Sequence, residues 1–418
     1  MFVLKTFPLT PERCITSLVP HEPHIVHVYD GADIFTVRVT GVPSHFSSGS
    51  LMLMFERLDL ERNVVKRILF TGHFRLDDYK KHLQDIPSLQ CLHENSEPLM
   101  IDELYLDTTF CSLSYPSFPT RDNAEEKIWQ VCQRWVRRNG MFKDTNPHHV
   151  VLLDIPSIVG YERILKKIHH KSLNKWLVHI SDETKINSST ADWTSPDPLK
   201  APWLHACKVS TSTLKTTFRS LPCQGGQFEV CIIKPVSEFF TRVKMIELET
   251  EGEDPGVSVS HGGSGYNICY SNHPSLREIE AFVRHFSPRQ IMPFALPRDC
   301  SKEELTDILA SFLVTSRDHE SNDDDNFEVP NETVTKQLSE RKRKSSSSDS
   351  GSSSKRMKLD RADSVTRISF DDIVDENDAE ENCENEPEVK TNEKITRYEI
   401  IFNSRNYNRS RHDSIEEH

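Results

Sequence analysis

The sequence predicts an α/β protein with two folded lobes followed by a disordered tail. β-forming residues dominate the opening of the chain, in segments 25–40 and 51–56. A strand, helix and strand follow in order over residues 148–180, a pattern typical of a right-handed parallel crossover. Beyond Arg317 the composition changes to acidic and serine runs with few aromatic residues. Such a segment can bury too little apolar surface to offset the loss of chain entropy on folding. We therefore expect residues 318–418 to be disordered.

The opening segment predicts antiparallel sheet. Asp30-Gly31 is a typical hairpin turn between its first two strands. Residues 120–139 change to helical spacing, and Thr120 or Asp122 can cap the start. Apolar side chains recur there every three to four residues, at Ile128, Val131, Cys132 and Trp135. We expect an amphipathic helix.

The crossover has three parts. HHVVLLDI (148–155) predicts a buried strand, YERILKKIHH (161–170) a helix and KWLVHI (175–180) a second strand. This order predicts a parallel sheet in the second lobe.

Composition sets limits on function. At 418 residues and 36% hydrophobic content, the chain is too long for one small core and too polar to fold throughout. Most of the net charge of −13 comes from residues 318–418, and the folded part has no Lys/Arg run that demands nucleic acid. The ten cysteines are scattered, which fits a reducing compartment. With no signal peptide and no apolar run of about 18 residues, we expect an intracellular protein without a membrane partner.

Two distant segments carry the strongest functional signal. YLDTTFC (105–111) places Asp107 after β-forming residues, where a strand ends. ICYSNHPSLREIEAFVRHFSPRQIMPF occupies residues 268–294. Together, and in this order, they resemble the Artemis-type DNA-repair nucleases, the β-CASP branch of the metallo-β-lactamase superfamily. The resemblance runs from about residue 14 to about residue 315.

The resemblance implies the domain organisation. Residues 1–97 and 272–317 would form a metallo-β-lactamase αββα sandwich that is incomplete at its N-terminus. Residues 98–271 would form the inserted β-CASP domain, with the active groove between the two lobes. The disordered regulatory tail, 318–418, would follow.

The resemblance also implies a structural zinc site in the insertion. His179 ends a predicted strand, His205 and Cys207 form the string HAC, and Cys223 follows in LPC. Two imidazoles and two thiolates make a closed tetrahedral set for zinc. The spacings are unlike those of zinc fingers, so the residues alone leave open that these are ordinary buried side chains.

The catalytic centre only partly matches the family. By resemblance, Asp107 is the acid of the first β-CASP motif and His273 the histidine of the third. The family's HxHxDH loop is absent. At the next ligand position the sequence has Phe46, and His45 lies one residue before it. The family string TGDFR reads TGHFR here, so His73 stands where the family has a carboxylate. An imidazole can bind one cation but adds no negative charge.

Two explanations for these differences stay open. A truncated gene model would account for the missing loop, and a true pseudoenzyme would account for Phe46 and His73 as well. The resemblance is compatible with an enzyme and with an inactive relative, and the altered ligands argue against a competent catalytic zinc or magnesium site. If the centre works, we expect Asp107 and His273 to support it, with His73 and His45 as substitute ligands.

The tail carries a bipartite nuclear-import pattern that would bind an import receptor. Its two basic clusters, separated by a serine-rich spacer, are Arg341, Lys342, Arg343 and Lys344, then Lys355, Arg356 and Lys358. The alternatives are a solvated charge run or a weak DNA tether. The pattern predicts localisation in the nucleus.

The combined interpretation is an Artemis-like nuclear DNA-repair protein. It would act on DNA ends, hairpins and single-stranded overhangs in double-strand-break joining and cross-link repair, together with other repair proteins. The reaction would be metal-assisted phosphodiester hydrolysis. The alternative is a catalytically inactive scaffold that binds DNA ends or repair factors. An RNA-processing role is disfavoured because His273 and YLDTTFC belong to the DNA-directed branch.

Overall fold

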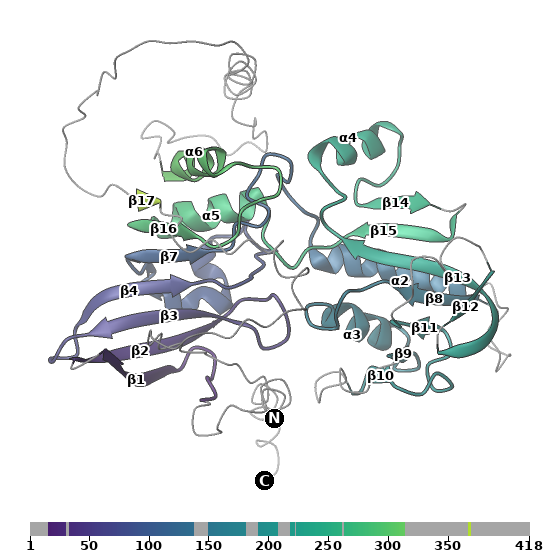
Figure 1. The fold of residues 1–418 in the computed structure, drawn as a ribbon, viewed down its shortest axis with the longest axis horizontal. Helices are drawn as coiled ribbons and strands as arrows, with labels where there is room; N and C mark the ends of the chain where they lie inside the picture. The colour runs from purple at the N-terminus through teal and green to yellow at the C-terminus, as the bar shows by residue number, and fades with distance from the viewer. Residues whose placement is uncertain are drawn as a thin grey trace, which may run out of the picture. The chain divides into compact units, whose positions relative to one another are not determined.

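The computed structural model describes residues 16–30, 33–137, 149–180, 191–207, 218–221, 223–260, 263–313 and 367–368. Its strands form two large sheets and one small one (Figure 1). Apart from Arg367–Ile368, the predicted tail lies outside the described residues, and so do both basic clusters. No helix in the described ranges is long and apolar enough to span a bilayer.

The first sheet has seven strands in the order β1-β2-β3-β4-β7-β16-β17. Strands β1 to β4 form an antiparallel meander, whereas β7, β16 and β17 are added in parallel. This confirms the expected antiparallel opening; residues 31–32 of the hairpin turn lie outside the description. The strand bounds are β1 Pro23–Asp30, β2 Asp33–Pro43, β3 Leu51–Leu58, β4 Val64–Phe70, β7 Glu103–Leu106, β16 Gln290–Pro293 and β17 Arg367–Ile368.

A buried apolar row crosses this sheet. Met54 pairs with Leu69, Leu69 with Leu104 and Leu104 with Ile291, each no more than 2% exposed. Helices α5 (Leu276–Phe286) and α6 (Lys302–Leu313) pack against it in one hydrophobic core. The core also includes the short 3-10 helices η2 (Leu83–Asp85) and η3 (Pro87–Leu92), next to the small hairpin of β5 (His93–Glu94) and β6 (Glu97–Pro98).

The position of β7 differs from what the predicted domain boundary implies. Residues 98–271 were assigned to the insertion, but Glu103–Leu106 lies in the first sheet between β4 and β16. Parallel pairing on both sides, together with the burial of Leu104 and Leu106, fixes it there. Residues 103–106 therefore belong to the first sheet. The described residues of this lobe supply one large sheet of the expected sandwich.

The second sheet belongs to the insertion and confirms the parallel crossover. Its path is β10-β9-β11-β8-β13-β15-β14, with β12 beside β13, and only β12 and β14 run antiparallel. The bounds are β8 His149–Leu153, β9 Val178–His179, β10 Thr194–Ser195, β11 Leu204–His205, β12 Phe218–Leu221, β13 Gln224–Val236, β14 Val257–Ser260 and β15 Gly265–Cys269. Strand β9 is shorter than predicted, and β11 separates it from β8.

Three helices accompany this sheet: α2 (Arg121–Arg137), α3 (Glu162–Lys171) and α4 (Arg242–Thr250). Helix α2 matches the predicted amphipathic segment, and the Thr120 hydroxyl accepts a hydrogen bond from Asn123 N at 3.3 Å. The buried side of α2 shares a core with α3 and the strands. Trp129 and Trp176, whose ring centroids are 5.2 Å apart, contribute to that core.

Helix α5 starts at a buried polar cap, which gives a first prediction. The Ser275 backbone and hydroxyl both donate to Glu278 Oε1, at 3.2 and 2.8 Å, and both residues are fully buried. Ser275→Ala is expected to lower the free energy of unfolding by about 1 kcal/mol or more, because Glu278 loses a donor. Urea denaturation measures this. Ser301→Ala, at the similar but exposed cap of α6, is the matched control, and a loss there as large as that of Ser275→Ala would contradict the prediction.

Candidate metal centres

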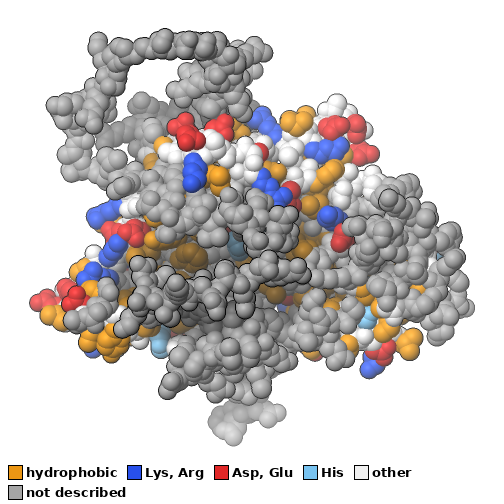
Figure 2. Space-filling model, in the orientation of Figure 1, with side chains coloured by type: hydrophobic (Ala, Val, Ile, Leu, Met, Phe, Trp, Pro, Cys, Tyr) orange, Lys and Arg blue, Asp and Glu red, His pale blue; other side chains and the backbone are white. Residues whose placement is uncertain are grey.

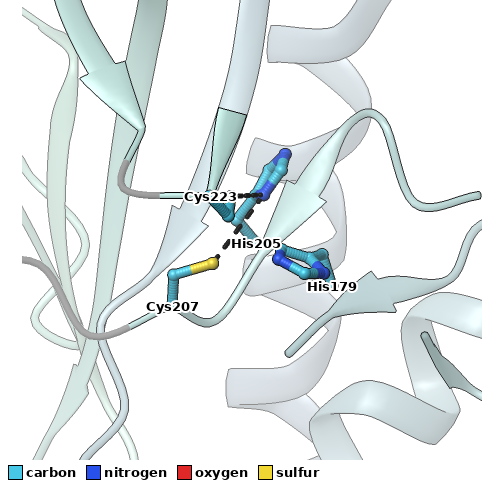
Figure 3. A group of neighbouring side chains, drawn as sticks. All are labelled: His179, His205, Cys207 and Cys223. Carbon is cyan, nitrogen blue, oxygen red and sulfur yellow. Dashed lines mark hydrogen bonds between the residues drawn. The ribbon is translucent and has the colours of Figure 1, made fainter. Parts of the chain in front are cut away.

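The strand register of the insertion brings two histidines together. His179 and His205 end β9 and β11, which are parallel neighbours, and the two residues are directly paired. Cys207 follows two residues later, and Cys223 directly precedes β13. The ligand atoms of these four residues all lie within 4.8 Å of one another, and Figure 3 shows the side chains gathered around one space.

Within the described part of the chain, one ring nitrogen of each histidine in this cluster has no hydrogen-bond partner. His179 Nδ1 lies 3.1 Å from Ser195 O, to which it donates its proton, so Nε2 keeps its lone pair. Among the described residues, His179 Nε2 is buried without a hydrogen-bond partner, whereas the nitrogen of His205 that lies near the sulfur atoms is Nδ1. A backbone carbonyl that accepts from the second ring nitrogen is the usual support of a metal-binding histidine. The arrangement fits a metal ion.

The sulfur atoms complete the donor set. Cys223 Sγ lies 3.3 Å and Cys207 Sγ 4.0 Å from His205 Nδ1. Hydrogen bonding with Cys207, and then with His205, lowers the pKa of the Cys223 thiol to about 4. A thiolate is the form that binds metals. Two imidazoles and two sulfurs are a closed tetrahedral set, so this cluster suits a structural ion rather than a catalytic one.

The second cluster comprises His73, Asp107 and His273, hereafter the trio. His73 follows β4, Asp107 directly follows β7, and His273 precedes α5. Because β4 and β7 are parallel neighbours, their carboxyl ends bring His73 and Asp107 to the same edge of the sheet. Asp107 Oδ2 lies 3.3 Å from His73 Nδ1 and 2.9 Å from His273 Nδ1.

Asp107 is held as a carboxylate. Burial opposes its ionisation, but the charge and hydrogen bond of His273, with those of His73, outweigh burial and hold the pKa of Asp107 well below its usual range. Its other oxygen, Oδ1, accepts from the Thr109 backbone at 3.1 Å and from the Thr109 hydroxyl at 2.6 Å. Two imidazoles and a carboxylate can together act as ligands of a divalent cation.

Phe46, not His45, faces the trio. The Phe46 ring centroid lies 5.2 Å from that of His73 and 5.7 Å from that of His273. His45 has an exposed side chain, a positive φ of 59° and a position outside the cluster. Of the four residues proposed for catalysis, the structure thus brings three together and leaves His45 out. The Phe46 ring, which has no donor atom, lies beside the two histidines of the trio.

Sequence reasoning missed two residues that support this centre. Thr109 binds the Asp107 carboxylate, and Arg75 donates to the backbone oxygen of His273 at 3.2 Å. Thr109 could have been found from its place two residues after an aspartate, a spacing at which side chains and backbone often bond locally. Arg75 is the last residue of the string TGHFR, in which only His73 was assigned a role from the sequence.

The fold is α/β with metallo-β-lactamase architecture, and it carries two candidate metal sites. Comparison with known proteins agrees: residues 192–298 match the family described as DNA repair metallo-beta-lactamase. The chain is similar to this family and, within it, to the Artemis-type β-CASP DNA-repair nucleases.

Three relatives illustrate the match. The chain is 25% identical to "Protein artemis" of Danio rerio, over 65% of this chain and 39% of that protein. It is 25% identical to "Protein artemis" of Mus musculus, over 65% of this chain and 36% of that protein. It is 24% identical to "DNA cross-link repair 1A protein" of Homo sapiens, over 69% of this chain and 26% of that protein. The matched part spans well under half of each relative.

Proposed function

We propose that this chain is a nuclear DNA-repair protein that recognises DNA ends and hairpins in double-strand-break joining and cross-link repair. The observation that carries the proposal is the contact between Asp107 and His273, 2.9 Å apart across 166 residues of sequence. These residues stand in the first and third β-CASP motifs of a DNA-repair family. Nuclear import by the two basic clusters of the tail is part of the proposal.

The ion of the insertion is proposed to be zinc. Cys207 and Cys223 favour a soft or borderline metal, and the closed four-ligand set with His179 and His205 is typical of structural zinc. The cluster joins β9, β11 and the segment before β13, so its role is to hold these segments together. Zinc here supports the fold on which DNA recognition depends.

The trio is proposed to be a weakened metal centre. A divalent zinc or magnesium ion bound there would supply an activated water and stabilise charge on a phosphodiester. Asp107 contributes the trio's only negative charge, and Thr109 orients it through Oδ1. His73 and His273 each offer one nitrogen, whereas Phe46 offers none. This centre favours slow cleavage or none, so DNA binding without cleavage is the second candidate function.

DNA contacts are proposed from the family rather than from the charge. Figure 2 shows Lys and Arg side chains dispersed among Asp and Glu on the visible part of the described surface. DNA binding by a surface of mixed charge depends less on counterion release than binding by a continuous row of Lys and Arg side chains. A modest dependence of affinity on salt concentration follows from the proposal.

The test is cleavage of 5′-labelled hairpin and single-stranded DNA by purified protein with zinc, magnesium or manganese. If the centre is active, Asp107→Ala is expected to reduce cleavage at least about 100-fold, because the carboxylate of the trio is lost. Asp85→Ala, which removes an exposed carboxylate of the same lobe, should leave the rate unchanged.

Binding measured on the same DNA separates the two functions. Binding without cleavage establishes the scaffold, and competition by RNA oligonucleotides tests the RNA-processing alternative. Absence of both binding and cleavage would contradict the proposed function. Cleavage that survives Asp107→Ala would place the active centre elsewhere.

A further inference from the structure

Arg75 is a buried cation at the junction of distant chain segments. It is 2% exposed and lies two residues after His73, in the loop that follows β4. A buried guanidinium is costly unless its donors and its charge are satisfied. The hydrogen-bond and charge partners of Arg75 therefore show which segments its guanidinium joins.

Three acceptors bind its nitrogens. Nη1 donates to His273 O at 3.2 Å, Nη2 to Pro119 O at 3.1 Å and Nε to Asp77 Oδ1 at 3.2 Å. These acceptors come from the segment before α5, the segment before α2 and the loop of Arg75 itself. One planar side chain thus fixes the two other segments against the loop that carries His73.

Glu278 neutralises the guanidinium from the first turn of α5. Its Oε1 lies 3.3 Å from Arg75 Nη1, and its Oε2 accepts from Leu76 N at 2.8 Å. The side chains of both charged residues are no more than 1% exposed. The pair therefore joins the start of α5 to the same loop by a charge contact and a backbone hydrogen bond.

A second arginine extends the network to the loop of Phe46. Arg121 Nε donates to Asp77 Oδ2 at 2.7 Å, and its Nη1 donates to His45 O. Arg75 N also donates to Ser44 O at 3.0 Å. The segments that carry Phe46, His73 and His273 are thus held by one continuous set of buried contacts.

We infer that Arg75, balanced by Glu278, is a positioning residue that holds the His273 imidazole against Asp107. The inference rests on the proposed metal role of the trio. Arg75 Nη1 and the Ser271 hydroxyl, at 2.9 Å, both donate to the His273 carbonyl oxygen, and Arg75 ties this oxygen to the loop of His73, which sets the direction of the His273 side chain toward the carboxylate. Lysine cannot replace Arg75, because one ammonium group cannot reach three acceptors that lie in a fixed fork.

The test compares Arg75→Lys with Arg67→Lys. Arg67 is the control: its Nε lies 3.0 Å from the buried Glu56 on the first sheet, and its own side chain is 23% exposed. Mn²⁺ affinity, titrated by electron paramagnetic resonance, reports on the trio because Mn²⁺ prefers oxygen and nitrogen ligands over thiolates. We expect affinity at least about tenfold weaker in Arg75→Lys, since loss of metal-supporting contacts typically costs about 10–100-fold. Arg67→Lys should bind like the wild type.

A second measurement does not depend on metal binding. The proton on His273 Nδ1, bonded to a buried carboxylate, should give a downfield resonance that is absent in His273→Ala. We expect this resonance in the wild type and in Arg67→Lys, and its loss in Arg75→Lys. If the wild type does not bind Mn²⁺, the proposed metal role fails, and the resonance alone decides the positioning role.

Two results would overturn the inference. One is wild-type affinity and resonance in Arg75→Lys. The other is an equal loss of both in Arg67→Lys, which would show a general effect of removing a partly buried arginine. Should Arg75→Lys fail to fold, Glu278→Gln removes the balancing charge while keeping a side chain of similar shape, and the same outcomes apply to it.

Discussion

Replacing Cys207 by serine is expected to remove one equivalent of zinc from the protein and to destabilise the insertion. The four ligands come from three separate segments, and the free energy of metal binding adds to the stability of the fold that assembles them. The buried Nε2 of His179, which has no hydrogen-bond partner among the described residues, would stay unsatisfied without the ion. We expect a loss of about 4 kcal/mol or more, equivalent to a Tm lowered by about 8–16 °C for a domain of this size.

Metal analysis by mass spectrometry and calorimetry measure the two effects. Cys132→Ala is the control, since it removes a fully buried thiol from the core of the same insertion without touching the cluster. That variant should keep its zinc and lose only the stability typical of a small core truncation. Wild-type protein without zinc, or equal behaviour of the two variants, would contradict a structural metal site.

The sequence was most informative where a motif coincides with the end of a strand. Asp107 was predicted to end a strand and does follow β7. Helix α2 was visible from its apolar spacing, and α3 from the run between two strands. These features depend on residues close together in sequence, so local patterns are sufficient to find them.

Contacts between distant segments were beyond local patterns. Nothing in the spacing of Arg75 indicates that its guanidinium binds a carbonyl 198 residues away. Strand β11 is only two residues long, too short for a periodic signal, yet it separates β8 from β9 and brings His205 beside His179. The residues of the proposed zinc site could be named only through the resemblance, because their convergence depends on the order of strands in the sheet.

Replacing Phe46 by histidine is expected to strengthen metal binding at the trio by about tenfold or more. Phe46 contacts the rings of both trio histidines but carries no donor atom. An imidazole at this position would add a third nitrogen to two imidazoles and one carboxylate, and divalent transition metals bind more tightly as such donors are added. Mn²⁺ titration by electron paramagnetic resonance measures the change without interference from the thiolate cluster.

Phe46→Leu separates donor chemistry from space. Leucine removes the ring without supplying a nitrogen, so its affinity should stay near that of the wild type. If leucine and histidine strengthen binding equally, the ring blocks the ion and the donor is irrelevant. If neither strengthens binding, His73 limits the metal affinity of the trio. By resemblance its imidazole stands where the family has a carboxylate, and it cannot supply that negative charge. Phe46→His combined with His73→Asp should then bind more tightly than either single variant, because it provides both a third donor and a second carboxylate.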